Sequence, residues 1–125
     1  MRATTDAGAI KASLEEPGNS GILVIDGRRV PECACFGERM AKLAIAKGWA
    51  GVVVAGLVRD IAVLQTLPLG VRALGSTARR PFGPEAEREF DVCLNIAGAN
   101  FWPGAMVYVD SDAVIVHHGV RSWAP

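Results

Sequence analysis

Residues 51–60, GVVVAGLVRD, carry the clearest structural pattern in the chain. The apolar run at residues 51–56 is typical of a strand that is buried on both faces of a parallel sheet. Residues 60–67 then predict a short helix, which a proline ends. The pattern therefore predicts a buried strand that leads directly into a helix, with an Arg–Asp pair at the junction.

The segments on either side predict further strands and helices in alternation. Residues 21–27 form an apolar run closed by an Asp–Gly turn, which indicates a second buried strand, and residues 71–74 indicate a third. A helix is expected from about Glu38 to Lys47, ended by Gly48, because apolar residues recur at helical spacing: Phe36, Met40, Leu43 and Ala44. This alternation is typical of an α/β fold with a parallel sheet.

The two ends of the chain differ in character. Near the N-terminus, Thr5–Asp6 can cap a helix that places Ile10 and Leu14 on one face. The polar residues 77–89 predict a loop. The last third predicts an antiparallel meander of three strands, at residues 92–96, 106–110 and 113–117. We expect a single domain over residues 1–125.

Composition argues against several classes of protein. The chain has 125 residues, of which 50% are hydrophobic and 21% are charged, so it can bury a core. Thirteen basic residues balance thirteen acidic ones, which argues against nucleic-acid or membrane-surface binding through bulk charge. No apolar run is long enough for a membrane span or an export signal, so we expect a cytoplasmic protein.

The three cysteines do not suggest a disulfide framework. Cys33 and Cys35 lie two positions apart, Cys93 is remote, and the two histidines, His117 and His118, are adjacent. This arrangement lacks the ligand spacing of a structural zinc site. We expect buried, reduced thiols.

Two of the expected helices start where strands end, which is where ligands bind in α/β sheets. One starts at Gly37 and Glu38, the other at Arg59 and Asp60. Unpaired N–H groups at both helix starts could hold a carboxylate, and the two acids could offer oxygen ligands to Mg²⁺ or Mn²⁺. Arg59 could stabilise a carbonyl or enolate oxygen. A purely structural interpretation also stands, because acids in a first turn complement the helix dipole.

Three features together resemble a known family. They are the stretch GWAGVVVAGLVRD (residues 48–60), the stretch FWPGAMVYVDSDAVIV (residues 101–116), and an acid, Glu38, separated by twenty intervening residues from the pair Arg59–Asp60. In these features the chain is similar to the family named for the regulator of ribonuclease E activity A. That family includes the class II pyruvate aldolases that act on 4-hydroxy-4-methyl-2-oxoglutarate.

The resemblance implies a fold and an assembly. The family fold is the swivelling β/β/α type, related to phosphohistidine domains, and the resemblance implies that the usual N-terminal segment is lacking here. Short members assemble as homotrimers or hexamers, with active sites near subunit contacts. Three tryptophans could contribute to such contacts, although packing within the core accounts equally well for the first two: Trp49, Trp102 and Trp123.

The resemblance also implies residue roles. Asp60 would bind a divalent metal, Mg²⁺ or Mn²⁺, and Glu38 would act in proton transfer from the outer metal shell. Arg59 would contact the substrate oxygen and stabilise the enolate. The backbone amides that would hold the pyruvate carboxylate belong to Gly37, Glu38, Arg39 and Met40. The implied activities are cleavage of 4-hydroxy-4-methyl-2-oxoglutarate-type 2-oxo acids and decarboxylation of oxaloacetate, with no nucleic-acid or membrane partner.

Some residues depart from the family pattern, and other functions remain open. Many members have Asp where Glu38 stands, and Arg28 and Arg29 replace a loop usually rich in glycine and serine. Ala105 and Ala113 replace more usual Asp and Gly at turns. One alternative is a protein-binding regulator that inhibits an RNA-processing endonuclease, but the best-known regulator lacks the Arg–Asp pair. Another is a truncated, inactive member. A methyltransferase is rejected, because no glycine-rich loop follows the first strand.

Overall fold

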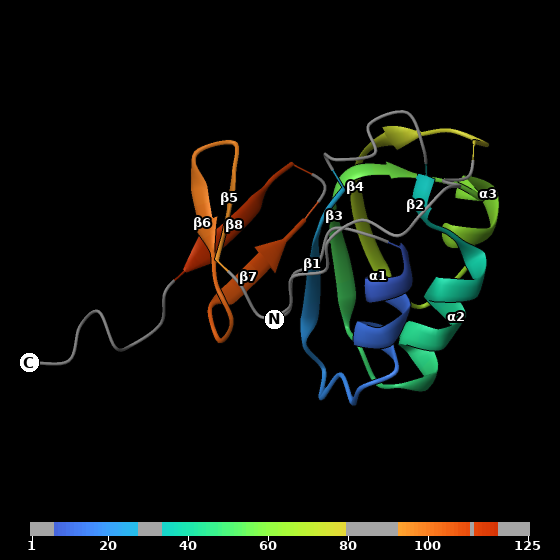
Figure 1. The fold of residues 1–125 in the computed structure, drawn as a ribbon, viewed down its shortest axis with the longest axis horizontal. Helices are drawn as coiled ribbons and strands as arrows, with labels where there is room; N and C mark the ends of the chain where they lie inside the picture. Colours follow the sequence, from blue (N-terminus) through green and yellow to red (C-terminus); the bar gives the residue numbers. More distant parts are fainter. Residues whose placement is uncertain (1–6, 28–33, 80–92, 111, 118–125) are drawn as a thin grey trace, which may run out of the picture.

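The computed structural model describes residues 7–27, 34–79, 93–110 and 112–117. Their centre is a four-stranded parallel sheet formed by β1 (Ile22–Asp26), β2 (Ala34–Phe36), β3 (Gly51–Val58) and β4 (Gly70–Ser76). Strand β3 pairs with β1 and β2 along one edge and with β4 along the other. On the first edge, the start of β3 pairs with β1 and its end pairs with β2, whereas on the other edge β4 pairs along β3 from Gly51 to Val58 (Figure 1).

Helices cover one face of this sheet, and two hairpins cover the other (Figure 1). The helices are α1 (Ala7–Leu14), α2 (Glu38–Ala46) and the single turn α3 (Ile61–Leu64). One hairpin pairs β5 (Leu94–Ile96) with β6 (Ala99–Phe101), and the other pairs β7 (Met106–Val109) with β8 (Val114–His117). The three layers give the α/β fold that the resemblance predicted.

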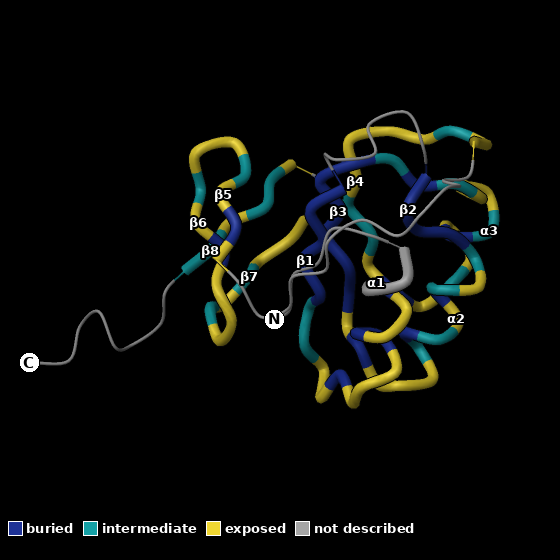
Figure 2. Tube along the Cα trace, in the orientation of Figure 1, coloured by how far each residue is buried: buried dark blue, intermediate teal, exposed yellow. Residues whose placement is uncertain are grey.

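The central strands are buried on both faces, which explains their unbroken apolar runs. The helix-side core includes Leu23 and Ile25 of β1 with Val52 and Val54 of β3. The residues between them point the other way, and this second cluster consists of Val24, Val53, Leu94 and Phe101. Figure 2 shows β1 and β3 almost entirely buried, whereas β4 is largely exposed.

Several elements confirm the sequence-based expectations. Strands β1, β3 and β4 and helix α2 lie where they were predicted, and Ile10 and Leu14 of α1 are both fully buried. Gly48 ends α2 with a positive φ of 82°. Among the described helices, none has the length and apolarity that crossing a membrane would require.

Other expectations were wrong, for local reasons. Phe36 belongs to β2 and not to the face of α2, because the extended Gly37 separates strand from helix. Helix α3 is one turn long, because the residues after it form tighter turns, such as Thr66 N–H to Val63 O at 2.9 Å. The C-terminal strands form two separate hairpins and not one meander.

Two of the cysteines can be placed, and they differ. Cys35 is buried, as expected, and burial raises the pKa of its thiol to about 11. Cys93 is exposed, so the expectation of a buried thiol was wrong there. Its position just outside β5 leaves it on the hairpin surface. Cys33 lies outside the described residues, as do Arg28 and Arg29.

Candidate functional site

The strand register brings the two predicted helix starts side by side. Phe36, the last residue of β2, pairs with Val58, the last residue of β3. The Arg59 N–H donates to the Phe36 carbonyl at 3.0 Å, which holds the two junctions together. Gly37 and Glu38 therefore lie against Arg59 and Asp60, although 22 positions separate Glu38 from Asp60.

Asp60 links the two junctions through its carboxylate. Its Oδ2 accepts the N–H of Glu38 at 3.0 Å, so Asp60 caps α2 from a different part of the chain. The Asp60 backbone is left-handed, with φ of 63° and ψ of 40°, a conformation that Asp adopts more readily than most residues. Its carbonyl still accepts the Leu64 N–H at 2.9 Å, which begins α3.

Gly37 makes room for the other side chains. A Cβ at this position would lie 2.9 Å from Arg59 Cγ and 3.0 Å from Asp60 Oδ2. Real Cβ atoms essentially never approach other atoms within 3.0 Å, so a larger residue would displace the arginine and press on the carboxylate. The absence of a side chain at Gly37 therefore leaves the space that Arg59 and Asp60 occupy.

The charged groups are partly exposed. Arg59 Nε lies 3.9 Å from Asp60 Oδ2, and their side chains are 26% and 37% exposed. Glu38 Oε1 pairs with Lys42 Nζ at 2.9 Å, one turn along α2. Exposed pairs of this kind contribute little stability, so the Glu38 carboxylate can leave Lys42 at small cost.

The start of α2 still offers backbone donors. The first intrahelical bond runs from Ala41 N–H to Gly37 O at 2.9 Å. Helix geometry leaves the amides of Arg39 and Met40 without an intrahelical acceptor, whereas Asp60 already takes the amide of Glu38. Two donors at the positive end of α2 are suited to an anion.

A hollow of about 400 Å³, here called the Arg59 hollow, opens beside Arg59 and Asp60, whereas residues 37–40 at the start of α2 do not line it. It is lined by Arg59, Asp60, Ile61, Ser76, Thr77 and Ala78. Sequence reasoning missed the last three residues: Ser76 ends the parallel strand β4, and Thr77 and Ala78 follow it. These residues could have been predicted, because the carboxyl end of a third parallel strand meets the same edge of the sheet.

The donor groups around Asp60 suit a divalent cation that keeps several waters better than a cation enclosed by protein ligands. Within the described ranges, no three His, Cys, Asp or Glu side chains gather as a metal-binding group. Mg²⁺ commonly keeps several waters and binds through one or two carboxylates. The Asp60 carboxylate offers hard oxygen donors beside a hollow, and one of its oxygens is not used by the Glu38 amide.

Comparisons with known proteins agree with this architecture. The family model described as RraA-like, Aldolase/RraA, matches residues 1–116. A protein of Xanthomonas campestris pv. campestris, provisionally named 4-hydroxy-4-methyl-2-oxoglutarate aldolase, is 39% identical over 120 residues. That match covers 93% of this chain and 69% of the relative.

Solved structures share the fold. The RNA-processing inhibitor RraA from "Thermus thermophilis" matches with a TM-score of 0.84 and 34% identity, over 93% of this chain and 72% of that one. A Geobacillus kaustophilus structure described as an S-adenosylmethionine:2-dimethylmenaquinone methyltransferase matches with a TM-score of 0.83 and 32% identity, over 94% and 74%. From the family match and these relatives we conclude that the chain belongs to the RraA-like (Aldolase/RraA) family.

Proposed function

We propose that this protein is a lyase, a divalent-metal-dependent aldolase that cleaves 4-hydroxy-4-methyl-2-oxoglutarate-type acids and also decarboxylates oxaloacetate. The observation that carries the proposal is the junction of Gly37–Glu38 with Arg59–Asp60, joined by the 3.0 Å bond from Glu38 N–H to Asp60 Oδ2. The name of the Xanthomonas relative supports the same reaction class.

The chain's own groups suit the binding of a 2-oxo acid. The substrate carboxylate would accept the amides of Arg39 and Met40 at the start of α2, where the helix dipole favours an anion. Arg59 would donate from its guanidinium to the 2-oxo oxygen. Both reactions place negative charge on this oxygen as the pyruvate enolate forms, so a fixed cation nearby lowers the barrier.

In this proposal, Asp60 binds the metal and Glu38 transfers the proton. Asp60 would hold Mg²⁺ or Mn²⁺ through the oxygen that does not accept the Glu38 amide. When bound, such an ion supplies Lewis-acid stabilisation of the enolate oxygen. Glu38 would release Lys42 and carry a proton to or from the substrate hydroxyl or a nearby water.

A variant at Asp60 tests this proposal. Asp60→Asn keeps a side-chain oxygen for the Glu38 amide and a residue that tolerates the left-handed backbone, but it removes the charge. We expect metal-dependent pyruvate release from oxaloacetate to fall at least about 100-fold, since electrostatic groups of this kind are worth that much. The matched control is Asp112→Asn, an exposed acid on the β7–β8 hairpin, which should retain activity.

The assay measures pyruvate release with Mg²⁺ and with EDTA, beside a thermal melt. EDTA-sensitive turnover at the wild-type rate in Asp60→Asn would show that Asp60 is not the metal ligand. A wild-type protein with neither turnover nor Mg²⁺ binding would overturn the proposal as a whole.

A regulatory function is the second candidate. It is supported by the match to the structure described as an RNA-processing inhibitor, at 34% identity. In that case the surface, and not the Arg59 hollow, would carry the activity. Inhibition of an RNA-processing endonuclease by Asp60→Asn as strongly as by the wild type, without any lyase turnover, would favour this candidate. Either candidate is proposed to act as a homo-oligomer.

A further inference from the structure

The strands β2, β3 and β4 end side by side at the candidate site. Val58, the last residue of β3, pairs with Phe36 on one side and with Ser76 on the other, and these two are the last residues of β2 and β4. The Thr77 N–H donates to the Val58 carbonyl at 2.9 Å, as the Arg59 N–H donates to the Phe36 carbonyl at 3.0 Å. Arg59 therefore leaves the sheet between the start of α2 on one side and the end of β4 on the other.

The two sides of Arg59 offer different hydrogen-bond donors. On the α2 side the donors are the backbone amides of Arg39 and Met40, which begin the helix. On the β4 side they are the hydroxyls of Ser76 and Thr77, and both residues line the Arg59 hollow. The start of α2 does not line this hollow. A 2-oxo acid with its carboxylate on the α2 amides and its oxo oxygen on Arg59 therefore extends its remaining end toward the two hydroxyls.

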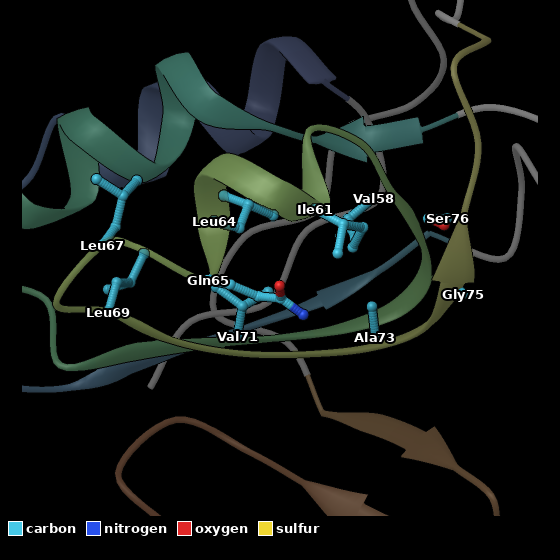
Figure 3. A pocket seen from close by; sticks show the side chains of 10 residues that line it. All are labelled: Val58, Ile61, Leu64, Gln65, Leu67, Leu69, Val71, Ala73, Gly75 and Ser76. Carbon is cyan, nitrogen blue, oxygen red and sulfur yellow. The ribbon is translucent and has the colours of Figure 1, made fainter.

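Both hydroxyls are accessible to a ligand. Thr77 is half-buried, and its Oγ1 accepts the Arg79 N–H at 3.3 Å, which leaves the hydroxyl proton to donate. Ser76 is exposed and also borders a second hollow, of about 440 Å³, between α3 and β4. Figure 3 shows Ser76 at one end of this second hollow and Leu69 toward the other. Because Ile61 and Ser76 line both hollows, there is room for a ligand group beside the Ser76 hydroxyl.

We propose that the hydroxyls of Ser76 and Thr77 bind the distal carboxylate of the substrate, which is the C5 carboxylate of a 4-hydroxy-2-oxo diacid. The inference rests on the proposed function and adds the residues that select a dicarboxylic substrate. Hydroxyl groups form short, strong hydrogen bonds to a carboxylate, and Arg59 adds a positive charge to the same hollow. A substrate with a methyl group in place of the C5 carboxylate gains none of these bonds.

A matched pair of ligands tests this carboxylate subsite independently of catalysis. 2-Oxoglutarate carries the C5 carboxylate, whereas 2-oxopentanoate has the same carbon chain with a methyl group at C5. Neither ligand has the C4 hydroxyl that aldol cleavage requires. Titration calorimetry of the full chain with Mg²⁺ should give 2-oxoglutarate an affinity at least about tenfold higher. Equal affinities, or tighter binding of 2-oxopentanoate, would overturn the inference.

Single hydroxyl deletions locate the effect. Ser76→Ala and Thr77→Val should each lower the affinity for 2-oxoglutarate about three- to tenfold and leave that for 2-oxopentanoate within about twofold. Thr77→Ser keeps the hydroxyl and the acceptor for the Arg79 amide, so it should bind as the wild type does. The matched control is Thr66→Val, which removes a hydroxyl that donates to the Val63 carbonyl and lies outside the Arg59 hollow. A loss shared equally by both ligands, or one as large in Thr66→Val, would overturn the inference.

Oxaloacetate separates this inference from the proposed function. Its second carboxylate is one carbon–carbon bond closer to the oxo group and leaves as CO₂, so its decarboxylation does not use the C5 position. Ser76→Ala should therefore decarboxylate oxaloacetate at the wild-type rate. Oxaloacetate turnover together with equal binding of the matched pair would overturn the subsite and leave the proposed function intact. A preference for 2-oxoglutarate that Ser76→Ala reduces, without any oxaloacetate turnover, would support the subsite and count against the lyase.

Discussion

The smallest residue in the candidate site has a large effect on its geometry. Gly37 contributes no side chain, yet the atoms that a Cβ would meet belong to Arg59 and Asp60. The two charged residues could be predicted from the sequence, because an Arg–Asp pair directly after a buried parallel strand lies at the sheet edge where ligands bind. The requirement for glycine at position 37 could not be predicted. It arises because the pairing of β2 with β3 brings residue 37 close to the residues that follow β3.

Gly37→Ala tests this requirement. The added methyl group must push Arg59 aside, so we expect oxaloacetate turnover to fall about 10–100-fold, as for other losses of supporting geometry. The cost in unfolding free energy should be about 1 kcal/mol, because flexible side chains can yield. Gly70→Ala is the control, since its Cβ would meet its nearest atom, Ala50 O, at an ordinary 3.8 Å. Equal turnover in both variants would contradict the positioning role of Gly37.

Cys35 and Cys93 should differ in their reactivity toward alkylating reagents. Burial raises the pKa of Cys35 to about 11 from a usual 9.0, so at pH 8 its reactive thiolate is scarce. Iodoacetamide followed by peptide mass spectrometry should modify the exposed Cys93 quickly and Cys35 only on unfolding. A pKa raised in the folded state also means stability that is full below pH 9 and is lost between about pH 9 and pH 11. Rapid labelling of Cys35 in the folded protein would contradict this.

At the scale of elements, the length and burial of a strand decide whether it can be predicted from the sequence. Strands β1 and β3 were predicted because both of their faces are buried and their apolar runs are continuous. Strands β2 and β6 have three residues each, too few to show any periodicity, and both were missed. The hollow between α3 and β4 could not be predicted for a different reason, because the distance between these two elements does not follow from any sequence pattern.

The turn of the β5–β6 hairpin offers a stabilising change. Ala97 and Gly98 both have positive φ, at 52° and 83°, the backbone of a type I′ turn that favours Asn–Gly. Ala97→Asn should raise the unfolding free energy by about 0.5–1 kcal/mol, because alanine is disfavoured in the left-handed region. Chemical denaturation measures the change. Ala113→Asn, at a turn position without positive φ, should give no such gain, and an equal gain there would refute the explanation.

At the scale of the whole molecule, exposed apolar residues predict association. The outward face of the β7–β8 hairpin carries Met106, Tyr108 and Ile115, which are 51%, 55% and 58% exposed. Neighbouring apolar residues of this size on a surface commonly mark an interface. Of the described tryptophans, Trp49 is buried in the core and Trp102 is 40% exposed, so only the latter could serve such a contact.

We expect a homo-oligomer, a trimer or a hexamer, at micromolar concentration. Light scattering should give a molar mass three or six times that of the chain. Ile115→Lys should reduce this mass, because it places a charge in the apolar face, whereas Lys47→Ala, an exposed change at the end of α2, should not. A stable wild-type monomer would refute the expectation.

The all-parallel sheet also has a kinetic consequence. No two adjacent strands in it can form as a local hairpin, because each pair requires a crossover of many residues. The two hairpins can close quickly by themselves, but an isolated pair of strands is marginal in water. Their buried residues, Leu94 and Phe101 among them, complete a cluster with Val24 and Val53 of the sheet. The two hairpins, which can form fastest, therefore become stable only after the slower parallel sheet has formed.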